Sequence, residues 1–169
     1  MPRPNLSRIP EWFHNYVNHV PENDLMEAMI KQTPSFINFF ESIPIIKRDY
    51  RYAEGKWTIK EMLQHIIDAE RVFAYRGLCI ARKDTTPLPG FDENNYANNA
   101  KVNKRNWDEM MEEFKAVRRS SEILFGSFDE EQLDTNGTAN NNPIYVLAIG
   151  FVLVGHVNHH ISILKERYL

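Results

Sequence analysis

The stretch Thr58-Ile59-Lys60-Glu61-Met62-Leu63-Gln64-His65 begins the clearest helical pattern in this 169-residue chain. Thr58 and Glu61 have the Thr-x-x-Glu spacing of a capping box, in which the two side chains satisfy free backbone N–H groups at the start of a helix. The apolar periodicity that follows continues to about Arg82. We therefore predict a helix over residues 58–82, with His65 on its apolar face.

Three further segments have helical periodicity, and no window alternates convincingly as a half-buried strand does. They run from Asn23 or Asp24 to Ser42, from about Asn103 to Gly126, and from Asn142-Pro143 to the carboxyl terminus. Asn142-Pro143 predicts the start of the last helix, because asparagine caps helices and proline suits the first helical position. Four long helices predict an all-α fold, a four-helix bundle.

Length and composition indicate one intracellular domain over residues 1–169. Residues 1–23 contain four prolines, so we expect an arm laid over the body rather than a regular element. A formal net charge of −3 gives no general attraction for nucleic acid or anionic lipid. A single cysteine, Cys79, fits a reducing cytosol. The amino terminus lacks a signal-peptide pattern, and the apolar run 144–154 is shorter than the roughly 18 residues that span a bilayer. These features predict a cytoplasmic protein.

The segment Gly155-His156-Val157-Asn158-His159-His160 supplies candidate metal ligands. Side chains four residues apart share one face of a helix, so two imidazoles at that spacing can bind one cation. At 100° per residue, His156 and His160 fall within the apolar stripe of the last helix, whereas His159 lies at its edge. We therefore choose His156 with His160.

His65 is the candidate third ligand, because it also points into the apolar stripe of its helix. It lies about 10 Å from the start of that helix, and His160 lies about 12 Å from the end of the last one. The three rings share a level only if these helices are antiparallel. An up-down-down-up order makes them so, provided that a long crossover joins helices two and three. The segment 84–102 can reach about 60 Å when extended, which is ample for a helix of about 39 Å.

A single buried histidine is usually a hydrogen-bonded core residue, and this is the alternative interpretation to a metal ligand. Three inward rings at one level favour a metal ion, because unpaired buried imidazoles would be costly. Ligation by histidine alone suits zinc, nickel, copper or iron better than magnesium or calcium. Three protein ligands leave a position open, as in catalytic sites: the ion could hold a thiol as thiolate or acidify a bound water.

Three weaker candidates surround this site. Arg76 lies on the same stripe as His65 and could bind a substrate carboxylate, or form a structural pair with a glutamate. Glu61 could accept a hydrogen bond from a ligand ring, although its capping role alone explains it. Tyr96 lies in the long segment 84–102 and either edges the pocket or is a solvated loop residue. Cys79 is expected to be a small buried apolar residue.

Several short motifs occur in an order that resembles a known family. They are Gly55–Glu61 followed by His65, Glu70–Arg76, Ile80–Arg82, Pro87–Asp92 and Gly155–His160. This order resembles the DinB-like/YfiT superfamily over residues 24–169. The resemblance implies an up-down-down-up bundle in which a divalent metal ion, often nickel or zinc, is held by three histidines. Those positions match His65, His156 and His160.

Relatives in that family include thiol S-transferases that use bacillithiol, mycothiol-dependent maleylpyruvate isomerases and proteins described as metal-dependent hydrolases, and many form homodimers. His156 stands where some isomerase relatives have glutamate, which favours the transferase or hydrolase branch. The expected function is a thiol-dependent S-transferase that uses a metal-held thiolate. The alternatives are a hydrolase that uses metal-bound water, and a non-enzymatic metal-binding stress-response protein. The expected partners are a small-molecule substrate, a low-molecular-weight thiol and a second copy of the chain, with no nucleic acid or membrane.

Overall fold

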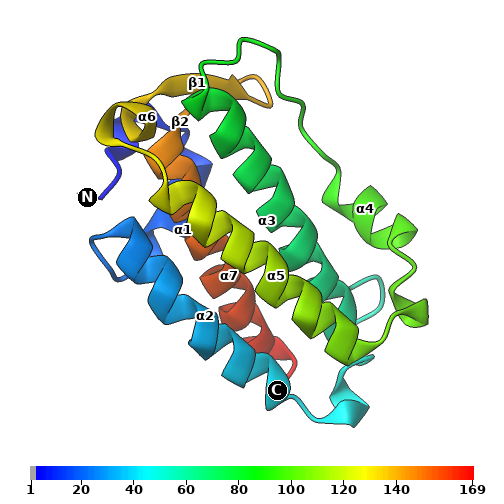
Figure 1. Cartoon of the computed structure of the whole chain (residues 1–169). Coiled ribbons are helices and arrows are strands. Elements are labelled where there is room, and N and C mark those ends of the chain that lie inside the picture. The colour runs from blue at the N-terminus through cyan, green and yellow to red at the C-terminus, as the bar shows by residue number, and fades with distance from the viewer. Residues whose placement is uncertain (1–2) are drawn as a thin grey trace.

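The computed structural model describes residues 3–169 and is mostly helical (Figure 1). Four long helices lie side by side: α2 (Leu25–Glu41), α3 (Ile59–Ala81), α5 (Trp107–Gly126) and α7 (Val146–Arg167). Three shorter helices are α1 (Glu11–Asn18), α4 (Glu93–Asn99) and α6 (Glu130–Asp134). Strands β1 (Asn136–Ala139) and β2 (Asn142–Tyr145) form an antiparallel hairpin in which Asn136 lies opposite Tyr145. Single 3₁₀ turns cover Leu6–Arg8, Ile45–Lys47 and Val102–Lys104.

Side-chain caps start three of the four long helices, and those of α2 and α3 lie where the sequence analysis predicts. The predicted capping box is present at α3, where the Thr58 N–H donates to Oε2 of Glu61 at 2.6 Å and the Glu61 N–H donates to Oγ1 of Thr58 at 3.1 Å. The Asp24 carboxylate accepts from the Glu27 N–H at the start of α2. Asn106 caps α5 in the same manner. Local hydrogen bonds therefore set these boundaries.

The predicted start of the last helix at Asn142-Pro143 is wrong, because these residues form strand β2 and α7 begins at Val146. Asn140 and Asn141 both have positive φ, 51° and 60°, and they form the two-residue loop between β1 and β2. Positive φ at both loop residues is typical of hairpin turns that match strand twist, and asparagine tolerates it well. The hairpin turn overrides the local helix signal.

The amino-terminal arm contains a helix that the sequence analysis did not predict. Residues 11–18 form α1, which packs against α7. Gly155 allows this contact, since a Cβ there would lie 1.9 Å from the backbone oxygen of Tyr16. The third long helix also differs from prediction and begins at Trp107, because Val102–Lys104 is a separate 3₁₀ turn. The segment 84–102 is not structureless, since it contains α4.

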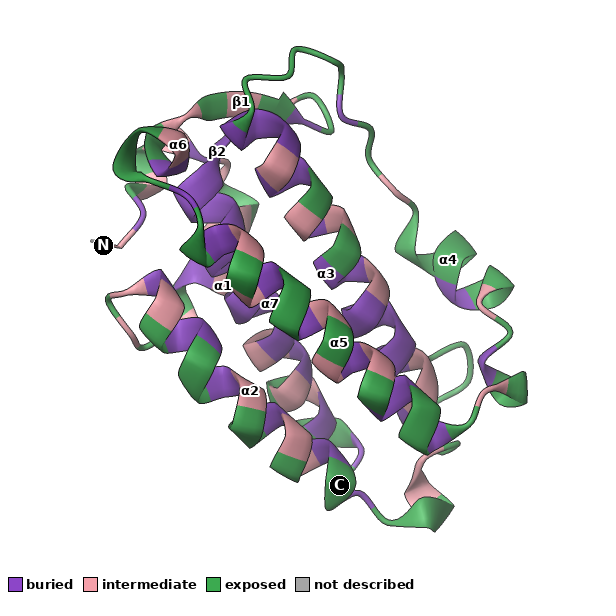
Figure 2. Ribbon diagram, in the orientation of Figure 1, coloured by how far each residue is buried: buried purple, intermediate pink, exposed green. Residues whose placement is uncertain are grey.

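Helix α7 is the core helix, and it packs against α1, α2 and α3. Every residue from 146 to 157 is buried, so this helix is enclosed on all sides over its first half (Figure 2). By length and composition alone it could cross a membrane, although its apolar run appeared too short in the sequence. Within the protein, 72% of its apolar window is buried. Burial in the bundle accounts for the apolar composition of α7.

Contacts along α3 show how it runs relative to its two neighbours. Gln64 of α3 accepts a hydrogen bond from Arg105, just before α5, and Gly77 near the other end packs under the ring of Phe125. These two helices therefore run in the same direction. Against α7 the order is reversed, because His65 lies beside His160 and Phe73 lies beside His156. Figure 1 shows the same directions, with the segment 82–106 carrying the chain back along the bundle.

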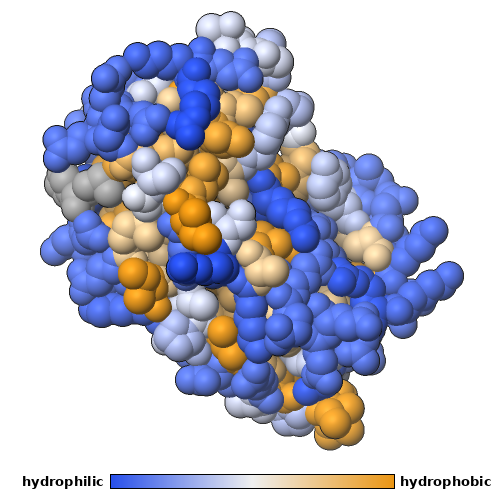
Figure 3. Space-filling view, in the orientation of Figure 1, coloured by the Kyte–Doolittle hydropathy of each residue, from blue (hydrophilic) through white to orange (hydrophobic). Residues whose placement is uncertain are grey.

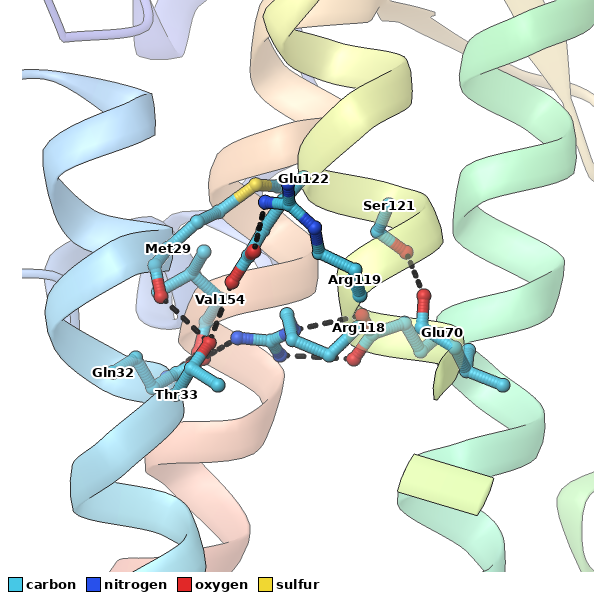
Figure 4. A network of polar contacts seen from close by, with 10 residues as sticks. Met29, Gln32, Thr33, Glu70, Arg118, Arg119, Ser121, Glu122 and Val154 are labelled. Atoms are coloured by element: carbon cyan, nitrogen blue, oxygen red, sulfur yellow. Dashed lines mark hydrogen bonds and ion pairs between the residues drawn. The ribbon is translucent and has the colours of Figure 1, made fainter. Parts of the chain in front are cut away.

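A buried polar network ties the four long helices together (Figure 4). Arg118 of α5 is fully buried and donates two hydrogen bonds to Glu70 of α3, at 2.7 and 2.8 Å. Its third hydrogen bond, also at 2.7 Å, goes to Oε1 of Gln32 on α2. The Gln32 amide then donates to the backbone oxygen of Val154 on α7. The two buried charges of this network, Arg118 and Glu70, are thus paired with each other, as such groups require.

Candidate metal centre

The three histidines singled out in the sequence meet inside the bundle. His65 comes from α3, and His156 and His160 come from successive turns of α7. Nε2 of His156 lies 3.0 Å from Nε2 of His65 and 3.0 Å from Nε2 of His160. All three residues are buried. Two elements that run in opposite directions thus deliver three ring nitrogens to one point.

Aromatic neighbours hold these rings in place. The His65 ring packs against Trp57, with 4.7 Å between ring centroids. The His156 ring contacts Phe73 of α3 edge-on at 5.7 Å and Tyr16 of α1 at 5.6 Å. Because these contacts come from three separate segments, the orientation of the rings depends on the packing of the whole bundle.

Burial keeps the three imidazoles neutral. It lowers the pKa of His65 to about 4 and that of His160, which also senses its histidine neighbours, to about 2. For His156, burial first and then the neighbouring rings lower the pKa well below its usual range. At neutral pH each ring therefore has one N–H and one lone pair. Neutral imidazole is the form that binds metal ions.

Hydrogen bonds alone do not satisfy this cluster. Nε2 of His156 has a single N–H or a single lone pair, so it can make only one good hydrogen bond although two other Nε2 atoms lie 3.0 Å away. Nδ1 of His160 is buried and has no partner among the described residues. Nitrogens that bind one ion at about 2.0–2.1 Å lie roughly 3–3.5 Å from one another. The three residues could therefore hold a metal ion, because one cation would take all three lone pairs.

His159 lies at the edge of the cluster, as the face analysis predicts. It is half-buried, and its ring contacts Tyr16 at 5.4 Å and His19 at 5.7 Å. Burial and the nearby His19 lower its pKa. A substitution of His159 can therefore serve as a control for substitutions of the three central histidines.

A cavity of about 450 Å³ opens beside the three rings. Its walls combine aromatic side chains with a few polar ones: Trp12, Phe13, Tyr16, Trp57, Phe73, Phe91, Arg76, Glu93, Asn140, His65, His156 and His160. The sequence analysis missed the residues of α1 in this wall. The spacing of Trp12, Phe13 and Tyr16 indicates one face of an amphipathic helix, and this signal could have found them.

The weaker candidates occupy different places. Arg76 is buried and lines this cavity, and among the described residues it forms no ion pair with a glutamate. Glu61 is engaged in the capping box, with Arg51 3.9 Å from its carboxylate. Tyr96 is 45% exposed and lines two neighbouring cavities, so the structure does not place it against the histidines. Cys79 is buried, as expected.

Comparisons with known proteins agree with this architecture. A family model of the DinB superfamily matches residues 29–164. The solved structure of YfiT from Bacillus subtilis, described as a probable metal-dependent hydrolase with an unusual four-helix bundle topology, is similar with a TM-score of 0.73. The two chains are 16% identical, and the match covers 96% of this chain and 89% of YfiT. At that identity the likeness shows a shared fold. No curated protein sequence matches significantly.

Proposed function

The chain belongs to the DinB superfamily, and on that premise we propose that it is a divalent-metal-dependent enzyme whose ion is bound by His65, His156 and His160. The observation that carries the proposal is the meeting of three buried, neutral rings, with Nε2 of His156 3.0 Å from Nε2 of each of the other two. Ligation by imidazole alone suits zinc, nickel, copper or iron, and the family resemblance favours nickel or zinc among them. The cavity beside the rings would give a small molecule access to the ion.

The proposal includes an up-down-down-up order of the four long helices. Its support is the parallel run of α3 and α5, together with the antiparallel run of α3 and α7. In this order His65 and His160 lie at one level, which an alternating order would not allow. The segment 82–106 would then be the crossover.

Hydrolysis is the reaction that we favour. A bound divalent cation supplies a Lewis acid that lowers the pKa of a coordinated water or thiol. The similar fold of YfiT, described as a probable metal-dependent hydrolase, supports this choice. The chain itself would position the ligand rings through Trp57, Tyr16 and Phe73 and would exclude bulk water along the aromatic walls.

Thiol-dependent S-transfer is the second candidate. Among the described residues, the cavity wall contains no serine, cysteine or lysine, and Cys79 does not reach it. A nucleophile from solvent or from a co-substrate fits this wall, and a low-molecular-weight thiol would be the second case. The non-enzymatic alternative, a purely structural ion, leaves the neighbouring cavity without a role.

Metal content tests the binding site. The protein should be purified without a histidine tag or added ions and analysed by plasma mass spectrometry. We expect about one nickel or zinc ion per chain, and a loss of most of it in His156→Ala, because three-histidine coordination falls to two. His159→Ala is the matched control and should retain the ion. Equal metal content in His156→Ala and the unchanged protein would contradict the site.

A turnover screen separates the reactions. Metal-loaded protein should be offered aryl esters and amides without thiol, and then electrophiles with several low-molecular-weight thiols. Turnover without thiol that disappears in His156→Ala supports hydrolysis, and turnover that requires thiol supports S-transfer. If neither reaction occurs while the metal content is normal, the result supports the non-enzymatic alternative, in which the ion is purely structural. The homodimer and the cytoplasmic location stay predictions, and light scattering in solution tests the first.

A further inference from the structure

Arg76 is a buried cation without an acidic partner. Only 7% of it is exposed, and its guanidinium makes one hydrogen bond among the described residues, from Nη2 to the backbone oxygen of Pro89 at 2.7 Å. Its Nε is buried and unpartnered. Arg118, the other buried arginine, shows the contrast, since Glu70 and Gln32 satisfy its guanidinium. A buried charge without a counter-ion is costly, so an anion that binds beside the guanidinium would be stabilised by it.

The position of Arg76 links this charge to the histidines. It lies on α3, about 16 Å along the helix axis from His65. Long side chains on a helix point back toward its amino terminus, so the guanidinium leans toward the level of His65. Arg76 and His65 line the same cavity. A molecule in that cavity could contact both.

The rest of the cavity wall is largely aromatic. It includes Trp12, Phe13 and Tyr16 of α1 and Phe91 of the segment 82–106. Glu93 is the one acidic residue among the described cavity residues; it is exposed and forms no ion pair with Arg76. Figure 3 shows that hydrophilic residues dominate the face in view, with apolar residues in small separate groups.

We propose that Arg76 is the anion-binding residue of this cavity, and that the substrate is an organic anion with an apolar, preferably aromatic, body and a carboxylate-type group bound by the guanidinium. The planar fork of arginine suits such a group. The assignment of the histidine end of the cavity as the place of reaction rests on the proposed function. The anion subsite itself requires no metal ion.

The alternative is that Arg76 only fastens the crossover segment through Pro89. That hydrogen bond uses one of the five guanidinium N–H groups and needs no charge. Arg76→Gln removes the charge and keeps a side-chain N–H donor, although a shorter one. Arg76→Met removes both.

The test is binding of a matched pair of probes, 4-phenylbutyrate and its neutral amide, to the metal-free protein by isothermal titration calorimetry. We expect the unchanged protein to prefer the carboxylate about tenfold or more, as a charge-assisted hydrogen bond provides. Arg76→Gln and Arg76→Met should lose this preference. Arg119→Met is the control, because it makes the same change at an exposed arginine on α5 and should keep it.

Three outcomes overturn the proposal: no preference in the unchanged protein, no binding of either probe, or a preference that survives in Arg76→Gln. The first two need no variant, so misfolding of a variant leaves the test intact. Because the titration uses metal-free protein, failure of the metal site leaves a carboxylate preference in place. Failure of the anion subsite leaves normal metal content, so the two proposals can fail separately.

Discussion

Tyr168, near the carboxyl terminus, is a buried phenol whose hydroxyl donates a 2.8 Å hydrogen bond to the backbone oxygen of Trp57. Burial, and then the charges of Tyr52 and Glu61, raise the pKa of Tyr168 to about 12 from its usual 10.0. The native state therefore keeps a proton that the unfolded chain releases. The stabilisation is complete below pH 10 and is lost as the pH rises toward 12.

Tyr168→Phe should therefore flatten the alkaline loss of stability. In the unchanged protein, the free energy of unfolding should fall between pH 10 and 12 by up to about 1.4 kcal/mol per pH unit more than in the variant. At pH 7 the variant should be less stable by about 1 kcal/mol, since the Trp57 carbonyl loses its donor. Urea denaturation at several pH values measures both effects. Tyr96→Phe, at an exposed tyrosine, is the control; identical slopes for Tyr168→Phe and the unchanged protein would contradict the argument.

Gly155 is the residue on which the docking of α1 depends. One of its two Cα hydrogens faces the Tyr16 carbonyl so closely that a methyl group in its place would lie 1.9 Å from the backbone oxygen. Gly155→Ala should destabilise the protein by about 1–3 kcal/mol, because backbone rather than a flexible side chain must move. Gly126→Ala is the matched control, since its Cβ would meet only the end of Met26 at 3.4 Å. Equal denaturation midpoints for the two variants would rule out the tight contact.

At the scale of the elements, the Arg118–Glu70 pair joins α5 to α3. Both side chains are almost completely buried, at 0% and 1% exposure, so neither can turn to water when its partner is lost. Arg118→Leu should destabilise the protein by about 3–5 kcal/mol, because it leaves the Glu70 carboxylate buried and unpaired. Chemical denaturation measures this loss.

Two variants check the cause. Arg119→Leu removes an exposed charge from the next position and should change stability by no more than about 0.5 kcal/mol. The double variant Arg118→Leu with Glu70→Leu should recover much of the loss, because apolar side chains can replace a buried ion pair. If the double variant were less stable than Arg118→Leu alone, the pair would not be acting through its buried charge.

At the scale of the whole molecule, an ion shared by α3 and α7 would link folding to metal binding. A ligand that binds only the native state stabilises it, by about 4 kcal/mol at a thousand times its dissociation constant. Removing the ion with a chelator should therefore lower the melting temperature of the unchanged protein and leave that of His156→Ala almost unaffected. Calorimetry with and without chelator measures the difference. An equal shift in both proteins would point to an effect of the chelator elsewhere.

Local hydrogen bonds and periodicity determined much of this protein from its sequence. The capping box at Thr58 and the cap at Asp24 act over two or three residues, so their signals could be found without the fold. The faces of His65, His156 and His160 follow from helical spacing in the same way. The family could also be identified, because its motifs are short and occur in order.

Tertiary packing decided what depends on distant partners. Asn142-Pro143 has a helix-start pattern, yet the turn at Asn140-Asn141 pairs it with β1 instead. The side chains of α1 become cavity walls only where Gly155 lets α1 dock on α7. Whether Arg76 had a glutamate partner could not be read from spacing, because that partner would come from another element. Burial and pairing between remote segments are properties of the whole fold, and so they appear only when the chain is assembled.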